Sequence, residues 1–478
     1  MNHKIPFTQS TRELMPHVQE FVHLFPYTLS KNTKTHLKHL CKLIHHSAKH
    51  SPILQRENIE DMDAFMSKTR VYPLYNAIPE IIREKIGSSE KTGRTYRFTI
   101  DNRDITIHFV LPKSNRSNTE YEYSRIYESE ELTNAFFDSC IYKITVWLRV
   151  AYQFAGKTCA KNLTCYLFFT DHIKILPKKQ NETFTIDENS KFDGEATEGR
   201  LVGKSSPLDQ EHANTGITTS CTPDSTIIMY RMEEWFKVFI HETFHALGLD
   251  FSEMDTTESN KQIIHLFPGC SRDLDVRVYE TYCEMWAEIL NVLCIAYFSE
   301  SEKMIHSKLY NKTTRVISKN ARRTRKHSES VAYSRILSKT MSTTQQFIKY
   351  ERAYTMYQAA KVLTHYRLTY YDLCKENTPD KTYRERTPVF SYYIVKSVLF
   401  YHMNEFVDWC YKHNRGYKTI LHFMKTQENI REYGRLIGRL YKTEDFIQKL
   451  NQMVNYRKKH THNMTEIVNT LRMTLHEV

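Results

Sequence analysis

The chain has 478 residues with only 12 glycines, and 67 Lys and Arg residues against 55 Asp and Glu give a formal net charge of +12. This length exceeds one ordinary core and predicts two or three domains. No basic start leads into an apolar signal region, and no uncharged apolar run reaches the roughly 18 residues of a membrane span. We therefore expect no membrane insertion and an intracellular, cytoplasmic protein that is not secreted.

The predicted elements of the first half alternate between helix and strand. Residues 1–90 are expected to be helical, and residues 96–111 to form a hairpin around a turn at 101–104. A long helix is predicted at 130–154, followed by strands at 165–170 and 173–176. Residues 177–216 are polar without a period, which predicts a long exposed loop. The residues that end this loop, 214–218, are a candidate edge strand of a cleft.

The most informative stretch runs from Thr226 to Phe251. A short apolar run, 226–230, reads as a buried strand, and a helix is expected to follow with Glu233 and Glu234 in its first turn. This helix carries His241 and His245, and residues four apart on a helix share one face, so both side chains can hold one metal ion. Gly248 follows, where a helix of this length needs a left-handed exit.

The sequence His241-Glu242-Thr243-Phe244-His245, on a helix behind a strand, resembles the active-site helix of the zincin metallopeptidases. The resemblance covers about 25 residues. It implies an α+β zincin-like core, a Zn²⁺ cofactor held by His241 and His245, and Glu242 as the general base that takes a proton from water at the metal. One zincin branch has a third histidine three residues after the glycine, but this chain has Phe251 there.

The other branch, the gluzincins, takes its third ligand from a glutamate on a later helix, usually with a second acid four residues on. Residues 276–293 predict such a helix, with Glu280, Glu284 and Glu288 on one stripe. Both Glu280 and Glu284 fit the ligand position. Glu284 ranks slightly ahead because Ala287 and Glu288 follow it, and Asp250 is a distant third. His265 is an alternative ligand or oxyanion-stabilising residue.

Ten cysteines are scattered without a Cys-x-x-Cys pair. Several, such as Cys283 and Cys294, fall on apolar helical stretches, which favours reduced core residues over disulfides or a zinc finger. The Lys-, Tyr- and Ile-rich, Gly-poor composition also resembles that of proteins from large DNA viruses.

The amino-acid composition changes in the second half of the chain. Residues 301–345 are rich in Lys, Ser, Thr and Arg, which predicts a basic polar linker. Its run Arg322, Arg323, Arg325 and Lys326 could bind phosphates or nucleic acid. Helical periodicity returns in four segments that predict a bundle: 348–366, 389–413, 417–441 and 446–456.

These observations divide the chain into an N-terminal helical region (1–90), a zincin-like core (91–300), the linker (301–345) and a C-terminal helical domain (346–478). The function they favour is a zinc metallopeptidase acting on protein or peptide substrates, an endopeptidase rather than an exopeptidase. Two other hypotheses remain open. One is a structural or interaction protein, such as a virion component, that keeps a zinc site without turnover, and the other is a polyanion-binding protein built around the basic run.

Overall fold

The computed structural model describes residues 7–88, 90–112, 126, 129–177, 206–312, 322–376, 382–460 and 469–477, and the side chains of all these except 303–312 and 322–330. The basic run Arg322, Arg323, Arg325 and Lys326 therefore has a described backbone but no described side chains. The predicted loop 177–216 lies mostly outside the described residues. Among the described helices, none is both long enough and apolar enough to span a bilayer.

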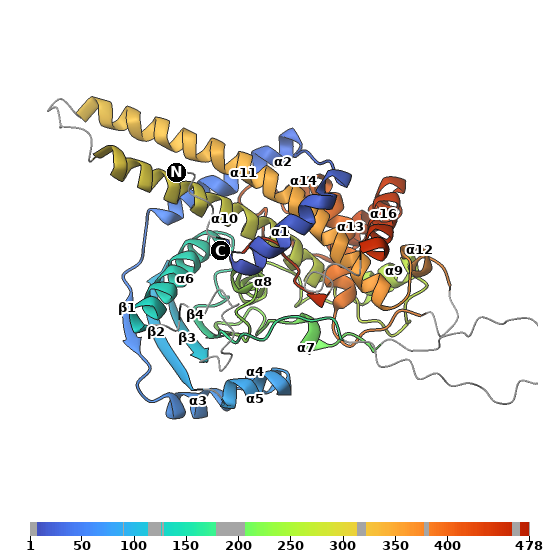
Figure 1. Ribbon diagram of the computed structural model, residues 1–478, viewed down its shortest axis with the longest axis horizontal. Helices are drawn as coiled ribbons and strands as arrows, with labels where there is room; N and C mark the ends of the chain where they lie inside the picture. Colours follow the sequence, from blue (N-terminus) through green and yellow to red (C-terminus); the bar gives the residue numbers. More distant parts are fainter. Residues whose placement is uncertain are drawn as a thin grey trace, which may run out of the picture.

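A mixed six-stranded sheet forms one side of the molecule (Figure 1). Its strands lie in the order β1-β2-β3-β4-β6-β5. Their bounds are β1 Gln55–Asn58, β2 Lys91–Ile100, β3 Arg103–Pro112, β4 Asn162–Phe168, β5 Gly216–Thr218 and β6 Asp224–Met229. Strands β3, β4 and β6 are parallel, whereas β1, β2 and β5 each pair antiparallel to their neighbours. The hairpin of β2 and β3 and the edge position of β5 were both predicted from the sequence.

Alternation along the central strands buries both faces of the sheet. On β6, Ile227 and Met229 point into the large core, whereas Ile228 points into a second, smaller core. Helices α3 Met62–Arg70, α4 Pro73–Asn76 and α5 Glu80–Ser88 cover the smaller core. The large core lies between the opposite face and the remaining helices, which puts the helix after β6 in the interior (Figure 1).

The helices on that side come from the whole length of the chain. Their bounds are α1 Gln9–Phe21, α2 Lys31–Ala48, α6 Glu130–Ala151, α7 Gln210–Ala213, α8 Trp235–Ala246, α9 Thr257–Leu266, α10 Val278–Lys312, α11 Arg322–His365, α12 Tyr370–Leu373, α13 Lys396–Tyr401, α14 Met403–His413, α15 Gln427–Leu440 and α16 Glu444–His460. A short 3-10 helix, η1, spans Val22–Leu24, and a π-helix, η4, spans Phe390–Val395. The chain is thus α+β, as expected, with helix as its main component.

The structure differs from the predicted elements in several places. Residues 55–58, within the region 1–90 that was expected to be helical, form strand β1, and the helix predicted at 417–441 begins only at Gln427. Residues 301–312 and 322–345 belong to the long helices α10 and α11, so the predicted linker is largely helical. Lys, Arg and Ser residues are all compatible with a helix. The segment was predicted to be a linker because its polar composition showed no helical period of apolar residues. Residues 173–176 form only an isolated bridge, Ile175 to Thr470. The predicted helix 389–413 is divided into η4, α13 and α14.

One hydrophobic core extends through both halves of the chain. It includes Ile240 of α8 and Leu290 of α10, together with Tyr354 of α11 and Phe400 of α13. In Figure 1, α10 and α11 run side by side across the top of the molecule, and these two helices are in contact. The C-terminal helices therefore form part of the surroundings of α8.

Candidate metal centre

Helix α8 carries the histidine motif in a fully buried position. It begins at Trp235, after Glu234 takes a left-handed conformation with φ of 60°. Glu233 and Glu234 therefore precede the helix, and the prediction that they lie in its first turn was wrong. The helix ends at Ala246, and Gly248, two residues further on, has the predicted left-handed conformation, with a φ of 61° that glycine adopts without strain. His241, Glu242 and His245 are 5%, 6% and 8% exposed, respectively.

Three ligand-type atoms converge at the inner face of this helix. Nε2 of His241 lies 3.1 Å from Oε2 of Glu280 and 3.2 Å from Nε2 of His245. The third side of the triangle, from Nε2 of His245 to Oε2 of Glu280, is 3.5 Å. A tetrahedral zinc site with bonds of about 2.0–2.2 Å has neighbouring ligand atoms roughly 3.3–3.5 Å apart. The sides of the triangle thus lie within about 0.2 Å of those of one face of such a tetrahedron.

The structure distinguishes Glu280 from Glu284, the two glutamates that the sequence offered as third ligand. Glu280, in the first turn of α10, belongs to the triangle of ligand atoms, and His241, His245 and Glu280 form a cluster able to hold a metal ion. Glu284, which the sequence ranked slightly ahead as a ligand, lies one turn further along α10. Its Oε1 is 2.9 Å from Nδ1 of His241, on the opposite side of that imidazole ring. This is an ion-pair distance rather than an aligned hydrogen bond.

The second histidine has a matching carboxylate on its far side. Nδ1 of His245 lies 2.7 Å from Oδ2 of Asp250, which also accepts a hydrogen bond from the main-chain N–H of Ser252. Carboxylates in this position fix the tautomer and orientation of a ligand histidine and raise its basicity. Glu284 and Asp250 therefore occupy equivalent positions behind His241 and His245.

Two buried lysines hold Glu284, and sequence reasoning missed both. Nζ of Lys237 donates to both carboxylate oxygens of Glu284, and Nζ of Lys396 lies 3.5 Å from Oε2. Lys396 also bonds Oε2 of Glu288 at 2.9 Å. Lys237 precedes His241 by four residues and therefore shares its helical face, so this spacing could have predicted that Lys237 lies near the site. Lys396 is distant in sequence and carried no signal.

Glu242 faces a small cavity next to the edge strand. A Cβ atom placed on Gly216 of β5 would lie 2.8 Å from Oε1 of Glu242, so only glycine allows this approach of strand to carboxylate. The cavity, of about 30 Å³, is also lined by His241, by Tyr392 of the π-helix and by Met473. Such a volume accommodates a water molecule beside Glu242.

Burial and neighbouring charges shift the ionisation of the whole cluster. Burial raises the pKa of Glu242. Burial acts to lower the pKa of His241, but its contacts with Glu280 and Glu284 outweigh that effect and raise it. Burial likewise acts to raise the pKa of Glu280, but His245 and His241 lower it far below its usual range. Glu280 thus stays ionised, and its negative charge calls for a proton on a histidine or for a cation.

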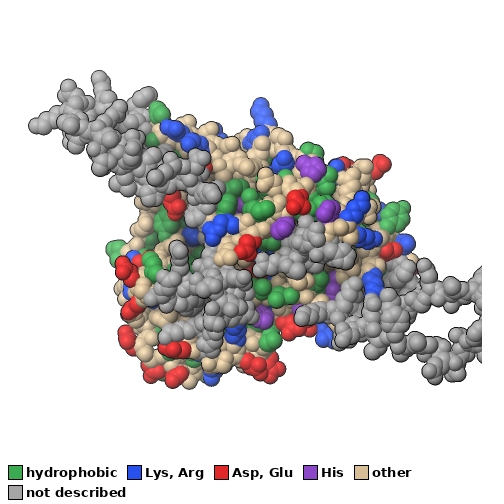
Figure 2. All heavy atoms as spheres, in the orientation of Figure 1, with side chains coloured by type: hydrophobic (Ala, Val, Ile, Leu, Met, Phe, Trp, Pro, Cys, Tyr) green, Lys and Arg blue, Asp and Glu red, His purple; other side chains and the backbone are tan. Residues whose placement is uncertain are grey.

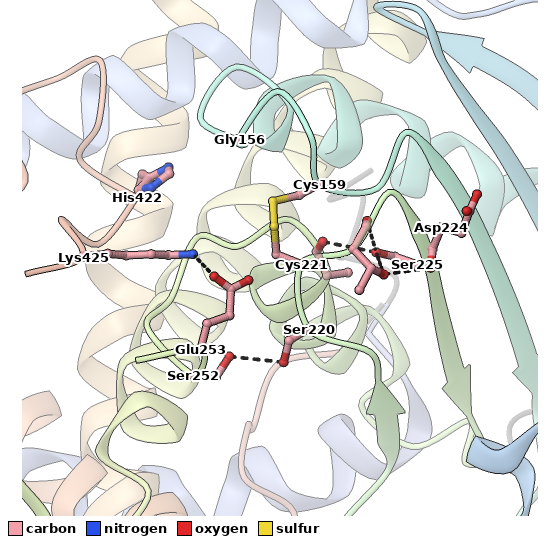
Figure 3. The surroundings of a disulfide bond; sticks show 12 residues. Gly156, Cys159, Ser220, Cys221, Asp224, Ser225, Ser252, Glu253, His422 and Lys425 are labelled. Atoms are coloured by element: carbon pink, nitrogen blue, oxygen red, sulfur yellow. Dashed lines mark hydrogen bonds and ion pairs between the residues drawn. A yellow bond between two sulfur atoms is a disulfide. The ribbon is translucent and has the colours of Figure 1, made fainter. Parts of the chain in front are cut away.

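A disulfide supports the end of α8 (Figure 3). Cys159 and Cys221, separated by 62 positions, are bonded, so the prediction of ten reduced cysteines was wrong for this pair. The other eight are free, and all but Cys374 are buried. The main-chain N–H of Cys221 donates to the carbonyl of His245 at 3.1 Å. A Cβ on Gly248 would lie 3.0 Å from Sγ of Cys159, so the helix exit packs directly on the disulfide.

Other candidate residues lie away from the triangle. His265 is exposed on the last turn of α9 and belongs to no metal-capable cluster among the described residues. Glu288 is fully buried and bonds Lys396. On the face drawn in Figure 2, described Asp and Glu side chains are most frequent at the lower left, over the sheet, and Lys and Arg are scattered over the helical part. The side chains of the basic run lie outside the described residues.

Comparison with protein-family models, with curated proteins and with solved structures finds no match to this chain. Any functional conclusion therefore depends on the geometry of the site itself.

Proposed function

We propose that this chain is a zinc-dependent metallopeptidase, similar in its site to the gluzincin branch of the zincins. His241, His245 and Glu280 would hold the metal, and Glu242 would act as general base. The observation that carries the proposal is the triangle of Nε2, Nε2 and Oε2 atoms with sides of 3.1, 3.2 and 3.5 Å, beside a buried glutamate.

The donor set favours zinc over other common cations. Two imidazole nitrogens and one carboxylate oxygen are ligands that Zn²⁺ accepts in catalytic sites, whereas Mg²⁺ and Ca²⁺ prefer oxygen alone. Three protein ligands also leave one position open. The carboxylates behind both histidines are the supports that such ligands have in zinc sites.

The chemistry of the site follows from the residues around Glu242. Zinc, when bound, would polarise the scissile carbonyl and lower the pKa of the attacking water. Glu242 would take a proton from that water and pass it to the nitrogen of the leaving amine. Burial raises the pKa of Glu242, which suits a group that must both accept and release a proton.

The edge strand β5 supports a peptide as substrate. It pairs with β6 on one side only within the described sheet, and Gly216 brings it against Glu242. An extended peptide could add to the other side through main-chain hydrogen bonds, which would place its scissile bond beside the base. The cavity of about 30 Å³ is far smaller than the several hundred Å³ of a typical ligand site, so peptide entry requires movement of its walls.

Metal analysis of the purified protein together with a Glu242→Gln variant tests the proposal. The parent should contain about one zinc per chain and hydrolyse peptides. Glu242→Gln should keep the zinc and lose about 100-fold or more of kcat, since general acid–base catalysis contributes about 10²–10⁴-fold. Hydrolysis by this variant at the parent rate would contradict the mechanism. A parent that binds zinc but is inert to varied peptides would favour the structural alternative.

A further inference from the structure

Residues 470–477, called here the 470–477 segment, run through the interior of the protein as an irregular peptide with bends at Met473 and Leu475. All eight residues are buried, and the parts of the chain that surround them include α1, α10, α11 and the region before α8. A buried peptide outside helix and sheet leaves its N–H and C=O groups without the partners that regular structure supplies, so the surroundings must provide them.

Side chains provide most of these partners. Oε1 of Glu234 accepts from the N–H groups of Met473 and Thr474, and the carboxylate of Glu351 accepts from those of Leu475 and His476. Gln358 donates to the carbonyl of Arg472 at 2.6 Å, Asn291 to that of His476 at 3.1 Å, and Thr11 to that of Leu475 at 2.8 Å. Such dedicated recognition of a peptide backbone is a built binding groove.

The groove is connected to the metal centre by a chain of contacts. The carbonyl of Met473 accepts a hydrogen bond from Nζ of Lys396 at 3.1 Å. Lys396 in turn contacts Glu284, and Glu284 contacts Nδ1 of His241. Met473 also lies beside the second lysine, with its sulfur 3.8 Å from Nζ of Lys237. Three contacts therefore separate the segment from the imidazole ring of His241.

Thr474 of the segment contacts Glu288, the second carboxylate that Lys396 bonds. Oγ1 of Thr474 lies 2.7 Å from Oε1 of Glu288 and 3.0 Å from Oε1 of Glu351. Burial and the nearby charge of Glu351 raise the pKa of Glu288 to about 8. Glu288 in its protonated form can donate to Thr474, while the Thr474 hydroxyl donates to Glu351. The hydroxyl thus holds Glu288, and with it one side of Lys396.

From these contacts we propose that docking of the 470–477 segment completes the metal centre. The segment contributes no ligand. It orients Lys396 through the Met473 carbonyl and through Glu288, and Lys396 with Lys237 then fixes Glu284 behind His241. Loss of the contact between the segment and Lys396 weakens metal binding without removing any metal ligand. This inference rests on the proposed function for its metal, and extends it to the regulation of the same site.

The experiment uses Lys396→Met and Thr474→Val in the full chain, alone and combined, with zinc affinity measured by competition with a chelator. Lys396→Met should weaken zinc binding about tenfold, at the low end of the roughly 10–100-fold range for groups directly behind a ligand. Thr474→Val should weaken it less. The two effects should not add, because both variants break one chain of contacts.

Two conservative variants and one control separate positioning from general destabilisation. Lys396→Arg and Thr474→Ser keep the charge and the hydroxyl, and should recover most of the affinity. Thr355→Val changes another buried threonine, on α11, whose hydroxyl has no hydrogen-bond partner among the described residues, and should leave zinc affinity unchanged. Circular dichroism establishes which variants are folded.

Parent-like zinc affinity in folded Lys396→Met would overturn the inference, as would equal effects of Thr474→Val and Thr355→Val. A parent chain that binds no zinc would instead refute the proposed function. In that case the imidazole resonances of His241 in the metal-free protein give the answer: Lys396→Met and Thr474→Val should shift them, and Thr355→Val should not. Absence of any shift would again overturn the inference.

Discussion

The Nε2 and Nδ1 sides of the two histidines have different surroundings. On the Nε2 side, His241, His245 and Glu280 leave a triangle of donor atoms with room for a cation. On the Nδ1 side, Glu284 and Asp250 are held by Lys237, Lys396 and the N–H of Ser252, so their charges already have partners. In the proposed site, a carboxylate that faces Nε2 would bind the metal, whereas one that faces Nδ1 would orient a ligand histidine.

The largest expected effect comes from breaking the Nε2 side. Glu280→Gln removes a charged donor from the triangle and should weaken zinc binding by more than about 100-fold, beyond the usual cost of a supporting group. Chelator competition on the folded variant checks this. If Glu280→Gln kept parent affinity while Glu284→Gln lost the metal, the assignment of the two sides would be reversed.

Glu284→Gln tests the Nδ1 side. Here we expect a loss of about 10–100-fold in zinc affinity, with about one zinc still bound at saturating metal. The amide also leaves Lys237 facing a neutral partner in a buried site, so some loss of stability should accompany it. Thermal unfolding with and without zinc separates the two effects. An affinity loss as large as that of Glu280→Gln would mean that Glu284 is itself a ligand.

Gly216→Ala should leave the contacts at Nε2 and Nδ1 of both histidines intact and displace Glu242, the proposed general base. The added Cβ would lie 2.8 Å from Oε1 of Glu242, so strand or carboxylate must move. We expect kcat/KM to fall about tenfold or more, since misplacement by about 1 Å can cost as much as 100-fold, with zinc affinity unchanged. Thr218→Ala, further along the same strand, is a suitable control. Parent-like kcat/KM in Gly216→Ala would show that the base tolerates the shift.

The smallest effect on the metal should come from the disulfide behind α8. Replacing Cys159 and Cys221 together by alanine opens a link between positions 62 apart and should lower the free energy of unfolding by about 2–4 kcal/mol. Zinc affinity should fall less than in Glu284→Gln, because the hydrogen bond from Cys221 to His245 is made by the main chain. Urea unfolding and chelator competition measure the two quantities. A larger zinc loss than in Glu284→Gln would make the disulfide part of the site.

Local patterns in the sequence determined much of the region around the histidine motif. Two strand-like segments around a turn predicted the β2–β3 hairpin, a short apolar run predicted strand β6, and helical spacing predicted that His241 and His245 share a face. The stripe of Glu280, Glu284 and Glu288 was also visible, since all three lie on one helix. These features depend on neighbours within a few residues, which is why one sequence was enough to find them.

Tertiary structure alone decided the rest. The sequence placed Glu280 and Glu284 on one stripe, but the packing of α10 against α8 determined which carboxylate faces Nε2 and which faces Nδ1. Lys396 and the 470–477 segment reach the site from more than 100 positions away, and Cys159 meets Cys221 across 62. Contacts between distant segments depend on how the helices pack in three dimensions, and no local period in a single sequence records that packing.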